Sequence, residues 1–174
     1  MNHYMNLIGQ NARKASLKKI NTKVKNKILK KYASLLDKER DAIIIENTKD
    51  IKFALKKRLK NNLIDRLTIN HKKLDNIKNS INKIIKLKDP VDNTLEKWSR
   101  PNGLKIKRVS IPIGVIGVIY ESRPNVTSDI ASLCFKSGNA VILKGGSEAI
   151  NTNKILAKLF RRALKESKVN ENFI

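Results

Sequence analysis

The chain has 174 residues, of which 40% are hydrophobic and 30% are charged. This length suits one domain, and this composition is typical of a folded protein rather than a disordered or membrane-embedded one. No run approaches the roughly 20 apolar residues that cross a bilayer, and the first ten residues lack the apolar core of a signal peptide. We therefore expect a cytoplasmic protein with no membrane partner.

Cysteine and histidine are too scarce for a disulfide or a zinc-type site. Cys134 is the single cysteine, and His3 and His71 are the two histidines. One cysteine excludes an internal disulfide, and structural zinc sites need a cluster of cysteine and histidine ligands. We expect no metal site.

The balance of charged residues is strongly basic. Lys and Arg outnumber Asp and Glu by 38 to 15, which gives a formal net charge of +23. Basic proteins attract phosphate backbones through counterion release, so a nucleic-acid-binding module is the alternative function. Lysine far outnumbers arginine, however, and the abundance of Lys, Asn and Ile is what an AT-rich genome produces. Because no recognition motif accompanies the charge, nucleic-acid binding is the less favoured interpretation.

Residues 1–90 show the apolar periodicity of helices. One helix is expected to start at Thr22, which is placed to cap it, and a later one ends before Asp89-Pro90, where proline prevents a helical hydrogen bond. Asp41–Arg58 is expected to form a helix between them. The expected core positions are Val24, Ile28, Leu29, Tyr32, Leu35 and Leu36, then Ile44, Ile45, Ile51 and Leu55, then Leu74, Ile77, Ile81, Ile84 and Ile85.

Residues 91–110 are expected to form a β-hairpin. Thr94–Ser99 and Leu104–Ser110 flank Pro101-Asn102-Gly103, in which Asn and Gly tolerate a positive φ. The second arm alternates apolar and basic residues, as a strand with one solvated face does. An exposed ribbon that connects two halves of a protein is as good an interpretation as an interaction arm.

Residues 111–174 show the pattern strand, helix, strand, helix. Ile111–Tyr120 is a continuous apolar run, typical of a strand buried on both faces of a parallel sheet. A helix then runs to Gly138, which suits a left-handed cap, and the strand Ala140–Leu143 follows. The expected core positions are Ile130, Leu133 and Cys134 in the first helix and Ile155, Leu156, Leu159, Phe160 and Ala163 in the second.

The expected fold class is α/β: N-terminal helices, a β-hairpin and one right-handed crossover unit of an open sheet. Two parallel strands make an incomplete sheet, because each leaves an edge that further strands normally cover. The chain therefore looks like the front of a larger protein. We expect it to be marginally stable and prone to aggregation by itself.

Ligands of open α/β sheets bind at the carboxyl ends of the strands, so the loop after Tyr120 is one candidate site. Its residues Ser122, Arg123 and Asn125 offer an anion a guanidinium and amide donors. The same residues also suit an ordinary helix-capping loop, which the pattern alone favours. Nearby, Gly114 and Gly117 fall within the expected strand, where close packing of a helix is the expected reason for glycine.

The loop after Leu143 is the second candidate site. Lys144-Gly145-Gly146-Ser147-Glu148 combines a cation, small residues that permit close backbone approach, and a following helix N-terminus. This combination suits a nucleotide phosphate or ribose, although neither loop matches the GxGxxG or P-loop pattern. Cys134 lies within a helix among apolar residues, so we expect a small buried hydrophobe rather than a nucleophile.

Two long runs carry a family resemblance. VSIPIGVIGVIYESRPNVT at 109–127 and IASLCFKSGNAVILKGGSE at 130–148 resemble the signature region of gamma-glutamyl phosphate reductase, also called glutamate-5-semialdehyde dehydrogenase. Asp65-Arg-Leu67 and Asp89-Pro-Val91 are similar to the same family, so the resemblance covers essentially the whole chain.

The family belongs to the aldehyde dehydrogenase superfamily, whose members combine a cofactor domain, a catalytic domain and an oligomerisation hairpin. The resemblance implies that residues 1–90 are the helical part of the cofactor domain, 91–110 the hairpin and 111–174 the start of a Rossmann-like NADP-binding sheet. It implies that the catalytic domain is absent from this chain.

The resemblance also implies a reaction. NADPH reduces L-glutamyl 5-phosphate to L-glutamate 5-semialdehyde and phosphate in proline biosynthesis, after a cysteine thiolate displaces the phosphate. Cys134 matches a helix residue of the cofactor domain and not that nucleophile, so this chain is expected to be inactive alone. A homo-oligomer of the full-length protein and a functional link to glutamate 5-kinase are further implications.

Five residues take roles from the resemblance. Asn125 matches the amide that stabilises the oxyanion on the substrate carbonyl. Lys144 matches the lysine that holds the adenosine ribose of NADPH or its 2′-phosphate. Ser147 and Glu148 lie where the superfamily contacts that ribose, although a Gly-Gly pair replaces the usual proline. Arg123 is expected to face the acyl phosphate or the substrate carboxylate.

Overall fold

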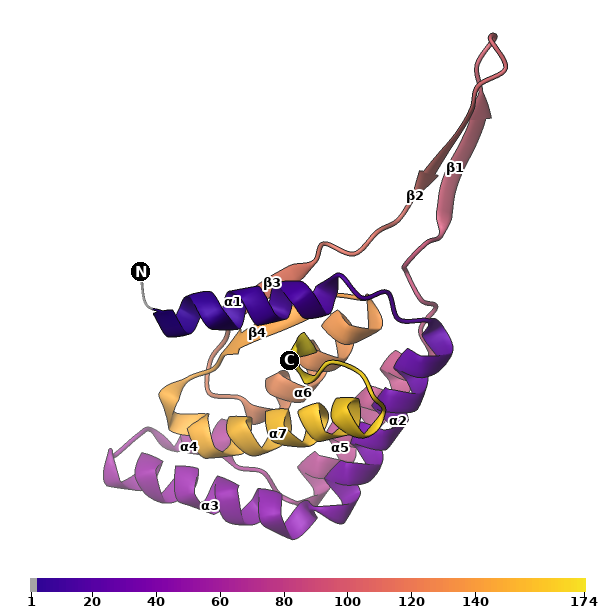
Figure 1. Cartoon of the computed structure of the whole chain (residues 1–174). Coiled ribbons are helices and arrows are strands. Elements are labelled where there is room, and N and C mark those ends of the chain that lie inside the picture. Colours follow the sequence, from indigo (N-terminus) through magenta and orange to yellow (C-terminus); the bar gives the residue numbers. More distant parts are fainter. Residues whose placement is uncertain (1–2) are drawn as a thin grey trace.

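A computed structural model describes residues 3–174, which form seven α-helices and two small sheets (Figure 1). None of these helices is both long enough and apolar enough to span a membrane. In chain order the elements are α1 (His3–Ser16), α2 (Thr22–Lys38), α3 (Arg40–Lys56), α4 (Asn61–Leu67), α5 (His71–Lys86), β1 (Thr94–Ser99), β2 (Lys105–Val109), β3 (Val115–Ile119), α6 (Pro124–Lys136), β4 (Ala140–Lys144), the 3₁₀ helix η1 (Ser147–Ala149), α7 (Ile150–Glu166) and the 3₁₀ helix η2 (Glu171–Phe173).

The helices and the parallel pair β3–β4 form one body, from which the hairpin of β1 and β2 projects (Figure 1). Within the body α2 packs against α5 and α7, while α6 packs against α5, α7 and β4. Helix α1 lies against β3 and β4. The strand, helix, strand, helix order predicted for residues 111–174 is confirmed.

Four aromatic side chains join these segments at the centre of the core. The rings of Tyr32 and Phe160 have centroids 4.5 Å apart, and Phe135 meets Phe160 and Phe173 edge-on at 5.7 and 5.4 Å. All four residues are fully buried. Burial raises the pKa of Tyr32, whose hydroxyl shares a 2.6 Å hydrogen bond with Ser128. Contacts between rings at these distances stabilise a core beyond the area they bury.

The predicted apolar stripes of α2, α5 and α7 are confirmed, because their members are buried or half-buried. Helix α3 instead buries a different face from the predicted one. Ile45 and Leu55 are 59% and 57% exposed. The buried face consists of Ile43, Asn47, Asp50 and Ala54. Because two of these residues are polar, a search for apolar periodicity does not find this face.

Helix α6 also buries a slightly different face from the predicted one. Leu133 is 46% exposed, whereas Ala131, Cys134 and Phe135 are buried. Gly138, just beyond the end of α6, has the expected positive φ of 77°. A side chain there would lie 3.0 Å from Pro112, so the position requires glycine for space as well as for conformation.

Strand β3 is shorter than predicted and is not buried on both faces. It pairs in parallel with β4, Val115 opposite Ala140 and Ile119 opposite Lys144. Ile111 and Ile113 precede the strand and are exposed, as is Ile119 at its end. Within residues 3–174 β3 has β4 as its single strand partner, so its other edge is uncovered.

The glycine prediction for this segment is wrong for Gly117 and holds only in part for Gly114, beside which the Arg13 side chain of α1 lies. Gly117 is exposed, and a side chain there would meet nothing within 4 Å, so no helix packs against it among the described residues. Gly114 precedes β3 rather than lying in it. Its φ of 116° requires glycine, and its N–H donates to Asn139 Oδ1 at 2.8 Å.

The predicted hairpin is confirmed, with β2 one residue shorter at each end than expected. Trp98 pairs with Ile106 across the antiparallel ladder. Gly103 alone of the predicted turn residues has a positive φ, of 82°, while the Asn102 side chain accepts from the N–H of Leu104 at 3.2 Å. All residues of β1 are exposed.

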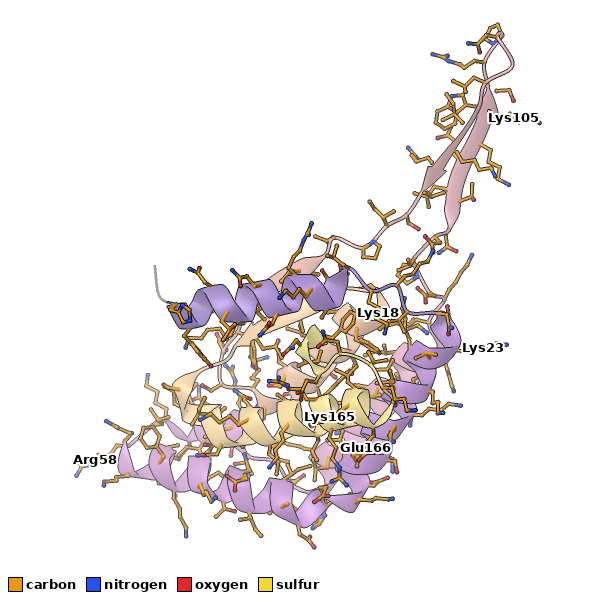
Figure 2. The ribbon with its side chains drawn as sticks, in the orientation of Figure 1. Lys18, Lys23, Arg58, Lys105, Lys165 and Glu166 are labelled. Atoms are coloured by element: carbon orange, nitrogen blue, oxygen red, sulfur yellow. The ribbon has the colours of Figure 1, made fainter. Side chains whose placement is uncertain are left out.

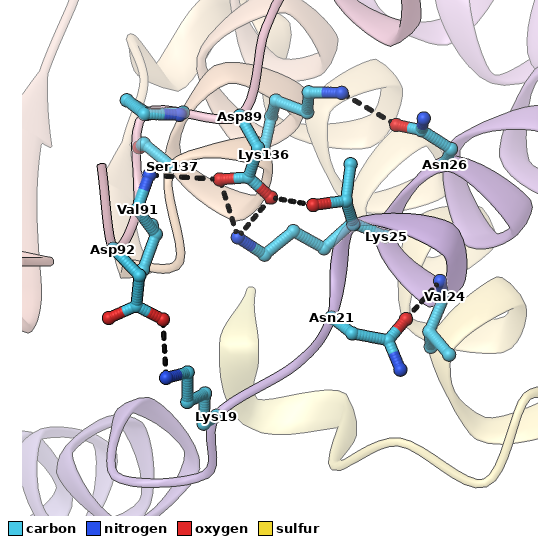
Figure 3. A network of polar contacts seen from close by, with 12 residues as sticks. Lys19, Asn21, Val24, Lys25, Asn26, Asp89, Val91, Asp92, Lys136 and Ser137 are labelled. Carbon is cyan, nitrogen blue, oxygen red and sulfur yellow. Dashed lines mark hydrogen bonds and ion pairs between the residues drawn. The ribbon is translucent and has the colours of Figure 1, made fainter. Parts of the chain in front are cut away.

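A buried ion pair attaches α2 to the segment that leads into the hairpin (Figure 3). Lys25 Nζ donates to Asp89 Oδ2 at 2.9 Å, and Asp89 also accepts from Thr22 Oγ1 at 2.8 Å. The prediction that Thr22 caps α2 is therefore wrong. Asn21 caps the helix, because its side-chain oxygen accepts from the N–H of Val24 at 2.9 Å.

Candidate functional site

Strands β3 and β4 end at the same edge of the sheet, which brings the two candidate loops together. The N–H of Tyr120 donates to the carbonyl of Lys144 at 3.1 Å as the strands finish. Beyond this point Ser122 Oγ donates to Glu148 Oε2 at 2.6 Å. The loop that holds Arg123 and Asn125 is thus hydrogen-bonded to the loop that follows β4.

Glu148 is the charged centre of the second loop. The hydrogen bond from Ser122, with the backbone N–H of Glu148 itself, Ser147 and nearby Lys144, lowers the pKa of this carboxyl. Glu148 is therefore ionised at neutral pH, next to an exposed lysine. An ionised carboxylate accepts hydrogen bonds from hydroxyl groups, and a lysine offers a cation to a phosphate, so this donor set fits the ribose end of a nucleotide.

Protein atoms fill the space that a side chain at either glycine of this loop would occupy. A side chain at Gly145 would collide with Asn153 and lie 2.9 Å from the Tyr120 ring. A side chain at Gly146 would collide with Ser122 Oγ and lie 2.8 Å from Glu148 Oε2. Glycine is needed here because the two loops touch, which gives an internal reason for the pair in addition to the predicted close approach of a ligand.

The N-terminus of α7 does not offer the anion site that was predicted from the sequence. Asp50 of α3 occupies this position with its carboxylate, which accepts from the N–H groups of Asn151 and Thr152 at 3.1 and 2.8 Å. Because these donors are already satisfied, a phosphate cannot use them. Sequence reasoning missed Asp50, since its partners lie about a hundred residues further along the chain.

The first loop borders a cavity of about 360 Å³ between α6 and the helices α4 and α5. Asn125 is exposed at the N-terminal turn of α6, and its amide donates to Asp129 Oδ2 at 3.3 Å. Burial raises the pKa of Asp129 more than this hydrogen bond lowers it. The cavity is lined by Arg66, Ile69, Lys73, Asn76, Ile77, Ser80, Arg123, Asn125 and Asp129.

A second cavity of about 350 Å³ adjoins the first, and Arg66 and Arg123 line both. Ser122, Gly146 and Glu148 line the second cavity from the sheet side. The structure therefore brings three of the five predicted site residues, Arg123, Asn125 and Glu148, to the lining of two adjoining cavities. Lys144 and Ser147 belong to the same loop as Glu148 but line neither cavity. Sequence reasoning assigned no role to Arg66, although Asp65-Arg-Leu67 is part of the family resemblance, because nothing in the local pattern places α4 beside the two loops.

Cys134 is the buried hydrophobe that the sequence predicted. It is 8% exposed, and burial raises the pKa of its thiol, which disfavours the nucleophilic thiolate. Within residues 3–174 no group of three His, Cys, Asp or Glu side chains is placed to hold a metal ion.

No family model matches the chain. A gamma-glutamyl phosphate reductase from Hydrogenobaculum sp. is 51% identical over 150 residues, which cover 86% of this chain and 34% of the relative. The solved gamma-glutamyl phosphate reductase from Thermotoga maritima is 42% identical with a TM-score of 0.92, over 95% of this chain and 41% of that one. The chain is similar to the gamma-glutamyl phosphate reductases in sequence and fold.

The resemblance to gamma-glutamyl phosphate reductase stated from the signature runs is thereby confirmed, and the nucleic-acid alternative is not favoured. An acetylating aldehyde dehydrogenase from Geobacillus thermoglucosidasius shares the fold alone, with a TM-score of 0.69 at 15% identity over 98% of this chain and 35% of that one. The chain spans between 34% and 40% of the length of the curated gamma-glutamyl phosphate reductases that it matches.

Proposed function

We propose that the chain forms the cofactor-binding part of a gamma-glutamyl phosphate reductase, which uses NADPH to reduce L-glutamyl 5-phosphate to L-glutamate 5-semialdehyde and phosphate in proline biosynthesis. The observation that carries this proposal is the 2.6 Å hydrogen bond between Ser122 and Glu148. It links the loop of Arg123 and Asn125 to the loop of Lys144. The link supports one site in which the proposed substrate loop and the loop proposed to hold the adenosine ribose share the carboxyl edge of the sheet.

Lys144, Ser147 and Glu148 would hold the adenosine ribose of the nicotinamide cofactor, which supplies a hydride when it is bound. The ionised Glu148 would accept a hydrogen bond from the free 3′-hydroxyl of this ribose, and Lys144 would attract the 2′-phosphate that distinguishes NADPH from NADH. Ser122 keeps the Glu148 carboxylate in place through its hydrogen bond. The remaining phosphates bind away from the N-terminus of α7, since Asp50 already satisfies its donors.

Asn125 would donate its amide hydrogen bond to the substrate carbonyl oxygen as negative charge develops there. Its present partner is Asp129 at 3.3 Å, a long contact that substrate can replace. Arg123 would contact the anionic end of the same substrate. The buried Cys134 is not the thiolate that displaces phosphate, so the 174-residue chain is proposed to lack turnover by itself.

The proposal extends to location and partners. We place the protein in the cytoplasm and expect homo-oligomers of the full-length reductase, with the β1–β2 hairpin as the contact arm. The projection of this hairpin from the body supports the second point (Figure 1). A functional link to glutamate 5-kinase is part of the proposal, because phosphorylation of the glutamate side-chain carboxylate by a kinase yields this acyl phosphate.

Titration of the purified chain with NADPH, followed by nucleotide fluorescence, tests the cofactor role. Lys144→Gln is expected to weaken binding about tenfold, since a charge-assisted contact to phosphate is lost. Lys158→Gln removes an equally exposed lysine on α7 and is the matched control. Equal binding by both variants would contradict the proposed site, and NADPH-dependent turnover by the 174-residue chain would contradict its proposed inactivity.

A further inference from the structure

One carboxylate lies between two arginines at the junction of the two cavities. Glu121 Oε2 is 3.7 Å from Arg66 Nη1 and 3.8 Å from Arg123 Nε. Arg66 belongs to α4, Arg123 precedes the first turn of α6, and Glu121 follows β3. Three separate segments thus direct one anion and two cations to the same point.

These contacts are too long to be hydrogen bonds, and they hold the three side chains only weakly. Glu121 is 76% exposed at its side chain, and each arginine is about half exposed. Within residues 3–174 Glu121 is the single ion-pair partner of both guanidinium groups. Both arginines therefore keep their N–H donors available for a stronger anion than Glu121.

The position of the pair indicates which anion this is. Arg66 and Arg123 line the cavity that holds Asn125 and also the cavity that holds Ser122 and Glu148. An anion between them lies between the proposed substrate residue Asn125 and the loop proposed to hold the adenosine ribose. Two planar guanidinium groups suit an anion with several oxygens, such as a phosphoryl group, better than a single carboxylate, which one guanidinium can satisfy alone.

We infer that Arg66 and Arg123 together form a binding site for a phosphoryl group, and that Glu121 occupies this site when the group is absent. The inference rests on the proposed function for the source of the group, the acyl phosphate of the substrate or the phosphate it releases. Arg66 is then a residue that determines specificity for acyl phosphates, and Glu121 is a built-in competitor that helps phosphate leave.

Inorganic phosphate is the probe, and ¹H–¹⁵N NMR of the 174-residue chain gives the affinity. Arg66→Gln and Arg123→Gln are each expected to weaken phosphate binding by about tenfold, because each removes charge-assisted hydrogen bonds. Glu121→Gln is expected to strengthen binding several-fold, since it removes the competing carboxylate. All three side chains are largely exposed, so circular dichroism should show an unchanged fold.

A matched control separates this site from general attraction to a basic protein. Glu96 lies 3.6 Å from Arg108 on the hairpin, and its side chain is 57% exposed, so Glu96→Gln makes the same charge change at another exposed ion pair. It should leave phosphate binding unchanged. Equal gains from Glu96→Gln and Glu121→Gln would overturn the inference, as would phosphate binding that Arg66→Gln does not weaken or no saturable binding at all.

Two further titrations separate this inference from the proposed function. L-Glutamate should bind more weakly than phosphate, and tighter glutamate binding that Arg66→Gln abolishes would reassign the arginines to a carboxylate and overturn the phosphoryl site. NADPH binding with no phosphate binding at Arg66 would overturn the inference and leave the proposed cofactor site standing. Phosphate binding that needs Arg66 but not Lys144, without NADPH binding, would support the inference and contradict the cofactor proposal.

Discussion

The carboxylate of Asp50 and the first turn of α7 are joined through Thr152, a residue 102 positions further along the chain. Asp50 Oδ2 accepts from the N–H of Thr152 at 2.8 Å and from its hydroxyl at 2.6 Å. Both residues are essentially fully buried. The pair attaches α3 to the start of α7, and so fixes the end of the loop that carries Lys144 and Glu148.

Asp50→Ala is expected to lower the free energy of unfolding by about 3 kcal/mol or more, because it leaves several buried donors without a partner. Urea denaturation followed by circular dichroism measures the change. Asp41→Ala removes an exposed acid from the same helix and should cost less than about 1 kcal/mol. A loss for Asp50→Ala no greater than that of the control would show that the carboxylate does not fasten α7.

Local patterns were sufficient to predict most of the helices and the hairpin. The apolar stripe of α7 repeats at helical spacing within the helix itself, and Gly103 and Gly138 mark their turns by conformation. Asp50 could not be identified as an anchor in this way. Its role depends on donors about a hundred residues away, and its polarity broke the apolar stripe of α3 that the prediction relied on.

In the candidate site, too, local patterns predicted some residues, while others depend on contacts between distant segments. Composition pointed to Arg123 and to the loop of Glu148, because basic and small residues follow apolar runs there. Arg66 was missed, since it meets these loops only after α4 folds back toward α6. The exposure of Ile111 was likewise beyond the sequence, because an apolar run predicts a strand but not how many neighbours cover it.

The two buried lysines Lys25 and Lys136 are expected to respond differently to the same substitution. Lys25 faces the carboxylate of Asp89, whereas Lys136 donates to Asn26 Oδ1 at 2.6 Å and to the carbonyl of Ile85 at 3.0 Å (Figure 3). Burial lowers the pKa of Lys136, so its charge is costly in the fold. Lys25→Met should cost about 2–4 kcal/mol by leaving a mostly buried carboxylate without its cation, and Lys136→Met clearly less. Equal urea midpoints for the two variants would contradict this assignment.

Acid is expected to weaken the fold by protonating Asp89, the partner of Lys25. Burial would raise the pKa of Asp89, but hydrogen bonds from Lys25, the N–H of Val91 and Thr22 outweigh it, so the pKa is lowered. Because the folded pKa lies below the unfolded value of about 3.9, the stabilisation is complete above that pH and is lost as the pH falls through the folded value. Urea midpoints should therefore drop below about pH 4. Lys25→Met should show a smaller drop, and an identical pH dependence would rule out Asp89 as a contributor.

Gly146→Ala is expected to impair nucleotide binding more than stability. The added methyl group would collide with Ser122 Oγ and crowd the carboxylate of Glu148, and so separate the two loops. NADPH affinity should fall several-fold in the fluorescence titration. Gly9→Ala is the control, since a side chain at Gly9 in α1 meets nothing within 4 Å and alanine favours the helix by up to about 1 kcal/mol. Unchanged NADPH affinity in Gly146→Ala would argue against a nucleotide site at this loop.

The projecting hairpin offers the last prediction, which concerns association. The side chains of the hairpin, such as Lys105, extend away from the body of the molecule (Figure 2). Leu95 of β1 is 59% exposed, and the same is true of Ile45 on α3, so a glutamate at either position replaces an equally exposed apolar side chain. If the hairpin is the contact arm, Leu95→Glu should shift sedimentation toward a monomer, while Ile45→Glu should not. Neither change should alter the free energy of unfolding by more than about 0.5 kcal/mol, since both side chains are outside the core. Equal sedimentation of both variants would mean that copies of the chain meet elsewhere or not at all.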